Sequence, residues 1–425
     1  MVIKRIAHIF FIVLWAESSI SQNISEADAF TDFITPEILV GKLMPSNTGF
    51  PELGIQKTFF LSFGSFNTKT HKEWSYRLNY PKTGLSIGFS DLGNSNDVGN
   101  AYIFMPFVEF DLFNKNRYKL HFGFGGSYHN RQYDIRLNQF NKGITTEFSW
   151  AFRMFGYYNL SQNNTTTTRI GIGYLHHSNG HIKLPNQGLN SFLVSLSLEQ
   201  KYNKNDYTTP QYPVENFNRS SYNYFSARAG IGQNVLSEIY NDKKEVYAIA
   251  LSYGKVINKT YSFGGGIYYR FYEHYYQYIK NEEMLVLEDY PELKENAILN
   301  ASTFGVFGSG ELLLNHIGIE FQLGLNIYKP FYKVDWRLNQ GYVFIAYDDE
   351  DEPYIAVKLG ELDSYYKIKK TISSRLGLKY YLKPTDEVPV HNFYIGAHLN
   401  ANLGQADFGE LSFGYVYNFN FKGSN

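Results

Sequence analysis

Hydrophobic and polar residues alternate with a period of two along most of the chain beyond residue 35. In an extended strand successive side chains point to opposite faces, so the alternation predicts strands with one hydrophobic and one polar face. The alternating segments are about 9–12 residues long, the length that a tilted strand needs to cross a bilayer. In the clearest of them, 317–327, the hydrophobic positions are Ile317, Ile319, Phe321, Leu323, Leu325 and Ile327.

The polar faces of these segments carry Glu, Gln, Asn and Arg, whereas the opposite faces are rich in aromatic residues. A soluble sandwich rarely combines two such faces, but a membrane barrel has aromatic girdles outside and a polar lumen inside. The pattern therefore predicts an all-β fold, an antiparallel transmembrane β-barrel of about 16 strands with a range of about 12–16. A single large barrel is the favoured arrangement, and two tandem eight-stranded barrels are the alternative.

The lengths of the connections predict the orientation of the barrel. In outer-membrane barrels the periplasmic turns are short and the extracellular loops are longer. If the chain starts in the periplasm, the short and long connections fall on opposite sides, apart from longer periplasmic stretches around 68–80 and 203–220. The short ones lie near 113–118, 161–167, 257–260 and 314–316, and the long ones near 129–145, 274–295 and 329–370.

Composition and charge exclude other classes of protein. Mean hydropathy is -0.33, and no segment after the N-terminus reaches the roughly 18 apolar residues of a spanning helix, which argues against a polytopic helical membrane protein. The formal net charge is -1 and basic residues form no stripe, so nucleic acid is not expected as a partner. The chain has no cysteine, which says little about the redox compartment.

The first residues have the layout of a secretory signal peptide. Lys4 and Arg5 precede an apolar run at 9–16, and small residues follow, with cleavage expected near Ser21 and Gln22. An exported barrel is expected to reach the bacterial outer membrane. The expected division is a signal peptide at 1–21, a periplasmic segment at 22–34, a first barrel half at 35–202 and a second barrel half at 203–425.

Two neighbouring strands within residues 168–199 place polar side chains on a hydrophobic face. Tyr174, His176 and Ser178 share that face in the first strand, and Asn190 and Phe192 share it in the second. The connection lengths place the polar residues at the external end, where they would face lipid. Polar groups in such surroundings cost free energy unless they are satisfied, so the pattern indicates a functional site.

His176 and Ser178 lie two residues apart on one strand face, which is close enough for a hydrogen bond. A serine hydroxyl becomes a nucleophile when a base takes its proton, and histidine is the usual base. Asn190 is placed to accept a hydrogen bond from the other ring nitrogen and so to hold the tautomer. The neighbouring His177 has the opposite phase and His181 lies in the loop. For the His–Ser pair alone, a polar pair at a loop edge is the alternative.

The segment H-H-S-N-G-H-I-K-L-P-N-Q-G-L-N-S-F, residues 176–192, resembles the active-site segment of the PagL family of outer-membrane lipid A 3-O-deacylases. The pattern of that family is H-x-S-N followed by P-N-x-G and a carboxylate. The resemblance covers residues 35–200 and implies that the first eight strands follow the family's small barrel. The family has a glutamate at the position of Asn190. The resemblance implies that Ser178 is the nucleophile and that His176 is the general base. It also implies that Asn179, Gly180 and Asn186 lie near the oxyanion hole.

The resemblance also implies the substrate, an ester-linked 3-hydroxyacyl chain of lipid A, and serine-type ester hydrolysis without a cofactor or a metal. Arg131 and Lys183 in the external loops are candidates for binding phosphate, and solvated loop charges are the alternative. Tyr174 and Phe192 are expected to provide an apolar wall for the acyl chains. The sequence has no metal-ligand spacing and no phosphate-binding loop.

The expected partners are lipid A in lipopolysaccharide, the outer-membrane lipids and the barrel-insertion machinery, with a homodimer left open. The rival hypothesis is a non-catalytic outer-membrane barrel, either a passive channel or a degenerate deacylase with a structural or lipopolysaccharide-binding role. Asn190 in place of glutamate, and the extra strands, favour this rival. Mass spectrometry of lipid A separates the two hypotheses, because only an enzyme removes one acyl chain.

Overall fold

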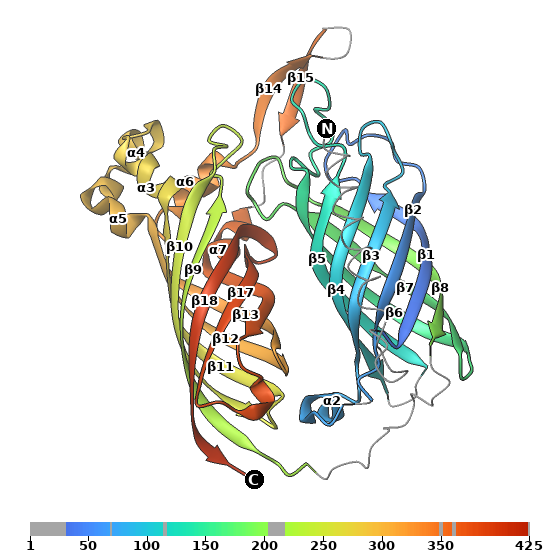
Figure 1. Ribbon diagram of the computed structural model, residues 1–425. Helices are drawn as coiled ribbons and strands as arrows, with labels where there is room; N and C mark the ends of the chain where they lie inside the picture. Colours follow the sequence, from blue (N-terminus) through green and yellow to red (C-terminus); the bar gives the residue numbers. More distant parts are fainter. Residues whose placement is uncertain are drawn as a thin grey trace, which may run out of the picture.

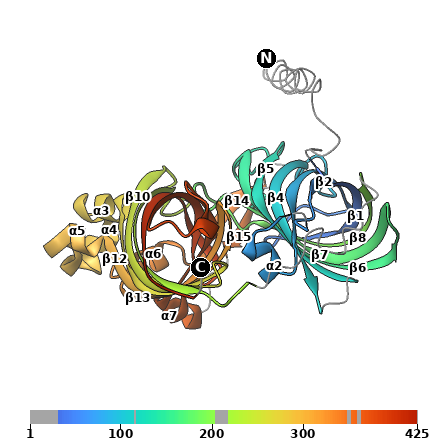
Figure 2. The same cartoon turned by 60° about the horizontal axis from the view of Figure 1, so that its bottom comes forward.

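The computed structural model describes residues 31–68, 70–113, 117–202, 217–347, 352–358 and 363–423. It contains two closed antiparallel barrels of eight strands each, which stand side by side (Figure 1, Figure 2). The expected signal peptide lies outside the described residues. In the described ranges, no helix is both long and apolar enough to cross a membrane.

The first barrel pairs each strand with the next in chain order and closes where β1 pairs with β8. The closing pair sets Ile38 opposite Leu196 and Met44 opposite Asn190. The strands are β1 (Phe33–Met44), β2 (Gln56–Ser65), β3 (Lys82–Asp91), β4 (Asn100–Leu112), β5 (Tyr118–His129), β6 (Phe148–Gln162), β7 (Thr166–Ser178) and β8 (Leu189–Lys201).

The second barrel closes where β18 pairs with β9. A separate hairpin, β14 (Tyr342–Tyr347) and β15 (Pro353–Lys358), is inserted between β13 and β16 and projects beyond the barrels (Figure 1). The barrel strands are β9 (Ser221–Asn234), β10 (Lys244–Ile257), β11 (Tyr261–Tyr272), β12 (Ser302–Leu314), β13 (Ile317–Tyr328), β16 (Ile372–Tyr381), β17 (His391–Asn402) and β18 (Gln405–Lys422).

The predicted all-β antiparallel class and the total of 16 barrel strands are confirmed, but the favoured single large barrel is wrong. Alternation reports which face a residue occupies and not which strand is its partner. The pairing of β1 with β8 leaves no free edge for β9 to extend. The two halves of the chain therefore close separately.

The longest connections, β11–β12 and β13–β16, lie at the top of Figure 1, whereas the long β2–β3 connection with α2 (Glu73–Arg77) lies at the other end. We take the top end as external because extracellular loops are the longer ones. The opposite end also carries the short 3-10 helix η2 (Thr385–Glu387). The external helical elements are α3 (Glu273–Lys280), α4 (Met284–Glu288), η1 (Pro291–Asn296), α5 (Ala297–Asn300), α6 (Tyr332–Leu338) and α7 (Asp363–Thr371).

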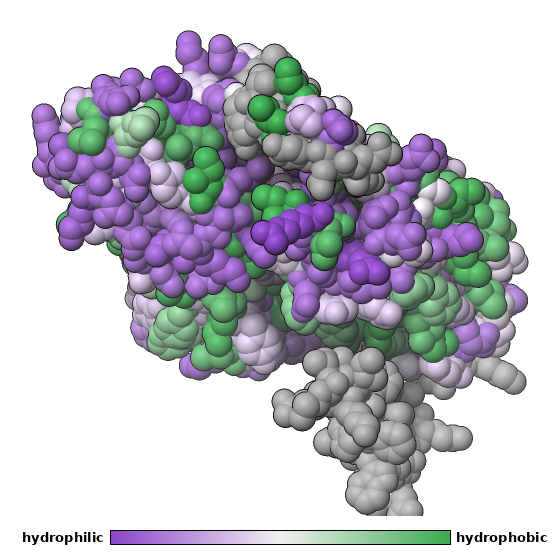
Figure 3. Space-filling view, turned by 90° about the horizontal axis from the view of Figure 1, so that it is seen from above, coloured by the Kyte–Doolittle hydropathy of each residue, from purple (hydrophilic) through white to green (hydrophobic). Residues whose placement is uncertain are grey.

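The outward faces of the strands are apolar and the inward faces are polar. On β7 and β8, for example, Ile172 and Val194 are exposed, whereas Arg169 and Ser195 are buried inside. Seen from above, hydrophilic side chains dominate the external end, and hydrophobic ones gather at the flanks (Figure 3). This distribution is the one expected of a barrel with a lipid-facing belt.

Charged networks fill the interior of the first barrel. Arg153 is fully buried and its guanidinium lies 2.5 Å from the Glu37 carboxylate. A second group joins Arg169 and Lys82 to Glu109, at 2.9 and 3.2 Å. Eight strands enclose a space just wide enough for side chains to fill. The described interior of this barrel is therefore packed rather than open.

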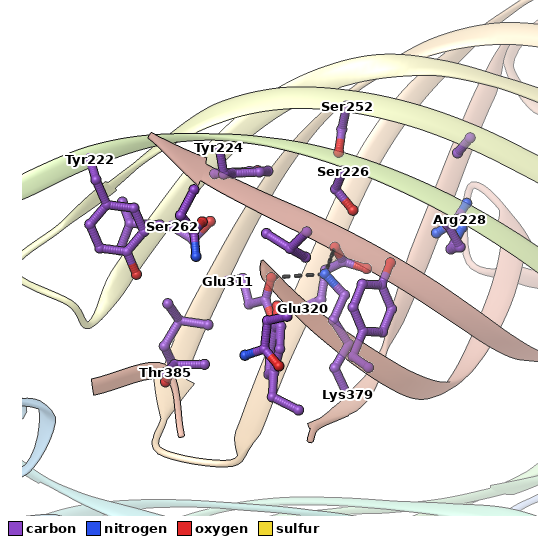
Figure 4. A pocket seen from close by; sticks show the side chains of 18 of the residues that line it. Tyr222, Tyr224, Ser226, Arg228, Ser252, Ser262, Glu311, Glu320, Lys379 and Thr385 are labelled. Carbon is purple, nitrogen blue, oxygen red and sulfur yellow. Dashed lines mark hydrogen bonds and ion pairs between the residues drawn. The ribbon is translucent and has the colours of Figure 1, made fainter. Parts of the chain in front are cut away.

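The interior of the second barrel is built in the same way. The Lys379 ammonium lies 2.8 Å from Glu311 and 2.6 Å from Glu320, and these side chains point toward one another inside the barrel (Figure 4). Arg375 lies 3.0 Å from Glu410. The remaining cavity beside them measures only about 40 Å³. In the described residues, buried ion pairs thus occupy part of the lumen of each barrel.

The two barrels contact each other near both ends. At the lower end, Lys72 pairs with Asp386 at 2.6 Å. At the external end, the side-chain amide of Asn241 is bonded to both backbone groups of Leu184, at 2.8 and 2.6 Å. The loop between β7 and β8 of the first barrel is thus held by a loop of the second.

Candidate active site

The end of β7 and the start of β8 bring the predicted polar residues together. The strands pair so that His176 is directly opposite Asn190. Tyr174 and His176 are on the outward face, while His177 is fully buried inside the barrel. The outward phase that alternation predicts for His176 is therefore the phase in the structure.

Asn190 holds the imidazole of His176 in one orientation. The Nδ1–H of His176 donates to Asn190 Oδ1 at 2.7 Å, and the hydroxyl of Tyr174 donates to the same oxygen at 2.5 Å. The Tyr174 ring also stacks on the imidazole, with centroids 6.1 Å apart. Because the amide oxygen only accepts, Nδ1 carries the proton and Nε2 is left as an acceptor. The second hydrogen bond to Asn190, from Tyr174, was not predicted from the sequence.

Ser178 is bonded to the loop that follows it rather than to His176. Its hydroxyl accepts hydrogen bonds from the Gly180 N–H at 3.3 Å and from Asn186 Nδ2 at 3.0 Å. Within the described part of the chain, no hydrogen bond joins Ser178 to His176, although their spacing predicts one. Ser178 is the last residue of β7, so its side chain turns toward the loop. Hydrogen bonds between a nucleophile and its base often tighten only in the substrate complex.

The loop orients the two donors. The Asn179 N–H donates to Asn186 Oδ1 at 3.1 Å, which turns the amide nitrogen of Asn186 toward Ser178. The backbone N–H of Asn179 therefore orients the Asn186 side chain and does not itself donate to Ser178. Gly180 has a φ of +70°, the left-handed conformation that glycine adopts most readily. The predicted members Asn179, Gly180 and Asn186 are thus in one hydrogen-bonded group with Ser178.

Gly188 packs against the imidazole. A Cβ at this position would lie 2.8 Å from His176 Cε1, and φ is +75°. A larger residue would displace the ring or distort the loop. The glycine of the P-N-Q-G segment therefore has a steric role beside His176, in addition to its role in the turn.

The site opens into a cavity between the two barrels. His176, Ser178 and Asn186 line one side, and residues of the second barrel line the other. Its volume is about 560 Å³. The expectation that these side chains simply face lipid is therefore incorrect at this level, because the second barrel covers that part of the outward face.

The predicted substrate-binding residues Tyr174, Phe192, Arg131 and Lys183 do not line this cavity. Phe192 is 58% exposed on the outward face, with its ring 5.5 Å from that of Tyr174, as expected of an apolar wall. Arg131 and Lys183 are exposed and are not among the residues that line the cavity. Among the described residues that line the cavity, the lysine is instead Lys369 of α7, to which no pattern in the sequence pointed.

The two neighbouring histidines have other surroundings. His177 Nδ1 lies 2.9 Å from the hydroxyl of Ser127 inside the barrel. The His181 carbonyl accepts a hydrogen bond from the Val235 N–H of the second barrel at 3.1 Å. Burial lowers the pKa of His181, and the Asp407 carboxylate partly opposes that shift. The described residues contain no group of three or more His, Cys, Asp or Glu arranged to hold a metal ion.

Comparison with known families finds one match in the first barrel. Residues 58–199 match the family model described as lipid A 3-O-deacylase (PagL). That range contains β3 to β7 entirely and includes His176, Ser178 and Asn190. A comparison with curated protein sequences finds no match.

Comparison with solved structures finds several matches, three of which are the following. The outer membrane enzyme PagL is 14% identical, with 38% of this chain and 97% of that chain covered and a TM-score of 0.28. CdiB from Acinetobacter baumannii is 10% identical, with 93% and 61% covered and a TM-score of 0.17. An outer membrane channel from Pseudomonas putida F1 is 8% identical, with 93% and 99% covered and a TM-score of 0.16. At these TM-scores none of the three carries an argument about this chain.

Proposed function

We propose, from a first barrel that is PagL-like, that the protein is an outer-membrane esterase that removes an ester-linked 3-hydroxyacyl chain from lipid A. One observation supports this proposal above the others. His176, oriented by Asn190, and Ser178, surrounded by two N–H donors, lie together at the external end of the outward face. Base, hydroxyl and donors are the parts that acyl transfer needs.

In the proposed reaction His176 Nε2 takes the hydroxyl proton of Ser178 as its oxygen attacks the ester carbonyl. The tetrahedral oxyanion accepts hydrogen bonds from the Gly180 N–H and the Asn186 amide, which already converge on the serine oxygen. The imidazolium then protonates the departing sugar oxygen, and the acyl group remains on Ser178. Water, deprotonated by His176, releases the 3-hydroxy fatty acid and restores the enzyme.

The test compares a Ser178→Ala variant with the wild-type protein. Loss of the nucleophile is expected to lower lipid A deacylation by about a thousandfold or more, because no other group can form the acyl-enzyme. Mass spectrometry of lipid A from cells that express each protein measures the loss of one acyl chain. Ser191→Ala is the matched control, since Ser191 is on the inward face of β8 and its loss leaves the site intact.

The second candidate is a barrel that binds lipopolysaccharide without cleaving it. The neutral amide of Asn190 favours this candidate, since a carboxylate stabilises an imidazolium better than an amide does. Identical lipid A spectra with the wild-type protein and Ser178→Ala, both correctly inserted, would support it and reject the esterase.

A further inference from the structure

The cavity beside Ser178 has walls from two different barrels. Its second-barrel side comes from the end of β9, from α6 and α7, and from the turn between β17 and β18. Six side chains of this side carry the argument and are called here the second-barrel wall. They are Asn234, Asp335, Trp336, Lys369, Gln405 and Asp407.

The second-barrel wall is polar, ordered and charged in both signs. Lys369 is 8% exposed and donates to Gln405 Oε1 at 2.8 Å. Asp335 accepts from the Tyr275 hydroxyl at 3.1 Å, and Asp407 accepts from the Tyr272 hydroxyl at 2.7 Å. Amides and carboxylates that converge beside an indole are suited to a sugar, whose hydroxyls need polar partners and whose C–H face packs on an aromatic ring.

Asn234 points independently to a ligand. It is 3% exposed, and in the described structure its Oδ1 has no hydrogen-bond partner. Buried polar atoms are nearly always paired, and an unpaired one costs free energy. Since Asn234 lines the cavity, a hydroxyl or amide N–H of a bound molecule would satisfy it.

The outward face of the first barrel is apolar beyond the His176–Asn190 pair. Phe192, Val194 and Leu196 follow one another along the outward face of β8 and are 58%, 59% and 56% exposed. On the outward face, the His176–Asn190 pair lies between this strip and Ser178, which lines the polar cavity. An amphiphile whose ester reaches Ser178 would have its acyl chain on this strip and its headgroup in the cavity.

We propose that the second-barrel wall binds the phosphorylated sugar headgroup of the lipid whose acyl ester reaches Ser178, with Lys369 facing a phosphate. This inference rests on the proposed function for its substrate. It assigns the second barrel a part in the site, so that one barrel supplies the reacting groups and the other recognises the headgroup. The shared cavity and the unpaired Asn234 are what carry it.

The test measures binding in detergent micelles, with the full chain carrying Ser178→Ala so that no turnover occurs. The probes are lipid A with its phosphates and the same lipid A after dephosphorylation. Adding Lys369→Ala is expected to raise Kd for the phosphorylated probe about tenfold, the size of one charged hydrogen bond, and to reduce the difference between the probes. Adding Trp336→Ala is expected to weaken both probes. Lys367→Ala, an exposed lysine of the same helix, is the matched control.

The outcomes separate the two proposals. Unchanged Kd values for both probes in the Lys369→Ala and Trp336→Ala backgrounds, with heat-resistant mobility showing folded barrels, would overturn the headgroup site. If only Trp336→Ala weakened binding, the proposed sugar contact would be retained and the proposed phosphate contact of Lys369 would be rejected. Weakened binding in these variants together with a wild-type protein that never deacylates lipid A would retain the headgroup site and reject the esterase.

Discussion

At the scale of single residues, the side-chain amide of Asn190 determines the tautomer and the orientation of the His176 imidazole. One oxygen accepts from both the imidazole Nδ1–H and the Tyr174 hydroxyl. The sequence predicted the outward phase of His176 and its partner Asn190, because alternation specifies the face of residues within a strand. It could not predict that Tyr174 joins Asn190 or that Ser178 turns to the loop, because those contacts depend on rotamers and on the course of the loop.

Replacing the amide by a carboxylate tests this role of Asn190. In Asn190→Glu the imidazolium that forms during attack would lie beside a negative charge, and hydrogen bonds between ionised groups are about twice as strong as neutral ones. We expect kcat for lipid A deacylation to rise about tenfold, equivalent to about 1.4 kcal/mol. Kinetics on purified protein in micelles measure it. The double variant with Ser178→Ala is the control, and its activity should stay at background.

At the scale of elements, the loop of residues 179–188 is the part of the site that the sequence described least. Strand alternation stops at Ser178, and nothing in the motif shows that a second barrel holds the loop through Asn241. Gly180 and Gly188 in this loop both have positive φ, which was not predicted from the sequence. The partner of the loop is 57 residues away in sequence, beyond the reach of any local pattern.

Removing the contact to Asn241 should loosen this loop. In Asn241→Ala both hydrogen bonds to the backbone of Leu184 are lost, two residues from Asn186. We expect kcat to fall about tenfold with little change in insertion, because small displacements of positioned groups are costly to catalysis. Asn392→Ala is the matched control. Asn392 makes the same reciprocal pair with Lys383 at the far end of the second barrel, at 2.9 and 3.0 Å, and its loss should leave kcat unchanged.

Asp335 in helix α6 makes the free energy of unfolding depend on pH. Burial raises the pKa of Asp335 to about 6, with Lys329 partly opposing the shift. A carboxyl whose pKa is raised on folding favours the folded state at low pH, and that contribution is lost as pH rises from 3.8 through 6. Asp335→Asn removes the charge, so we expect it to stabilise the protein at pH 8 by about 1–2 kcal/mol and to have little effect at pH 4. Urea unfolding followed by tryptophan fluorescence measures this difference.

The Asp335→Asn experiment has a matched control. Asp363→Asn changes an exposed carboxylate at the start of α7 and should shift the unfolding midpoint little at either pH. Equal unfolding free energies for the wild-type protein and Asp335→Asn at pH 8 would contradict the expected cost of the buried charge.

At the scale of the whole molecule, the chain consists of two closed barrels whose interiors are packed with ion pairs. The sequence predicted the number of barrel strands and their polar and apolar faces, because both depend on local alternation. It did not specify closure, because closure is a long-range choice of partner. Both β1–β8 and β9–β18 pairings join strands more than 100 residues apart.

The packed interiors predict the electrical behaviour of the protein. Arg153 and Glu37 in the first barrel, and Lys379 with Glu311 and Glu320 in the second, occupy the space that ions would need. We expect no stepwise conductance when the purified protein is reconstituted in planar lipid bilayers. Discrete conductance steps that scale with salt concentration would support the passive channel instead. Protein-free detergent added to the same bilayers is the control.

The closing pair of the first barrel has a consequence for biogenesis. Every strand of that barrel is present once residue 201 has been delivered, so its seam can seal while the remaining polypeptide is still unassembled. The brace of the loop that follows Ser178 comes from Asn241 of the second barrel, so it is complete only when that barrel has also closed. Maturation of the site would thus require assembly of the C-terminal half, so that the proposed activity would arise only after the entire molecule is in place.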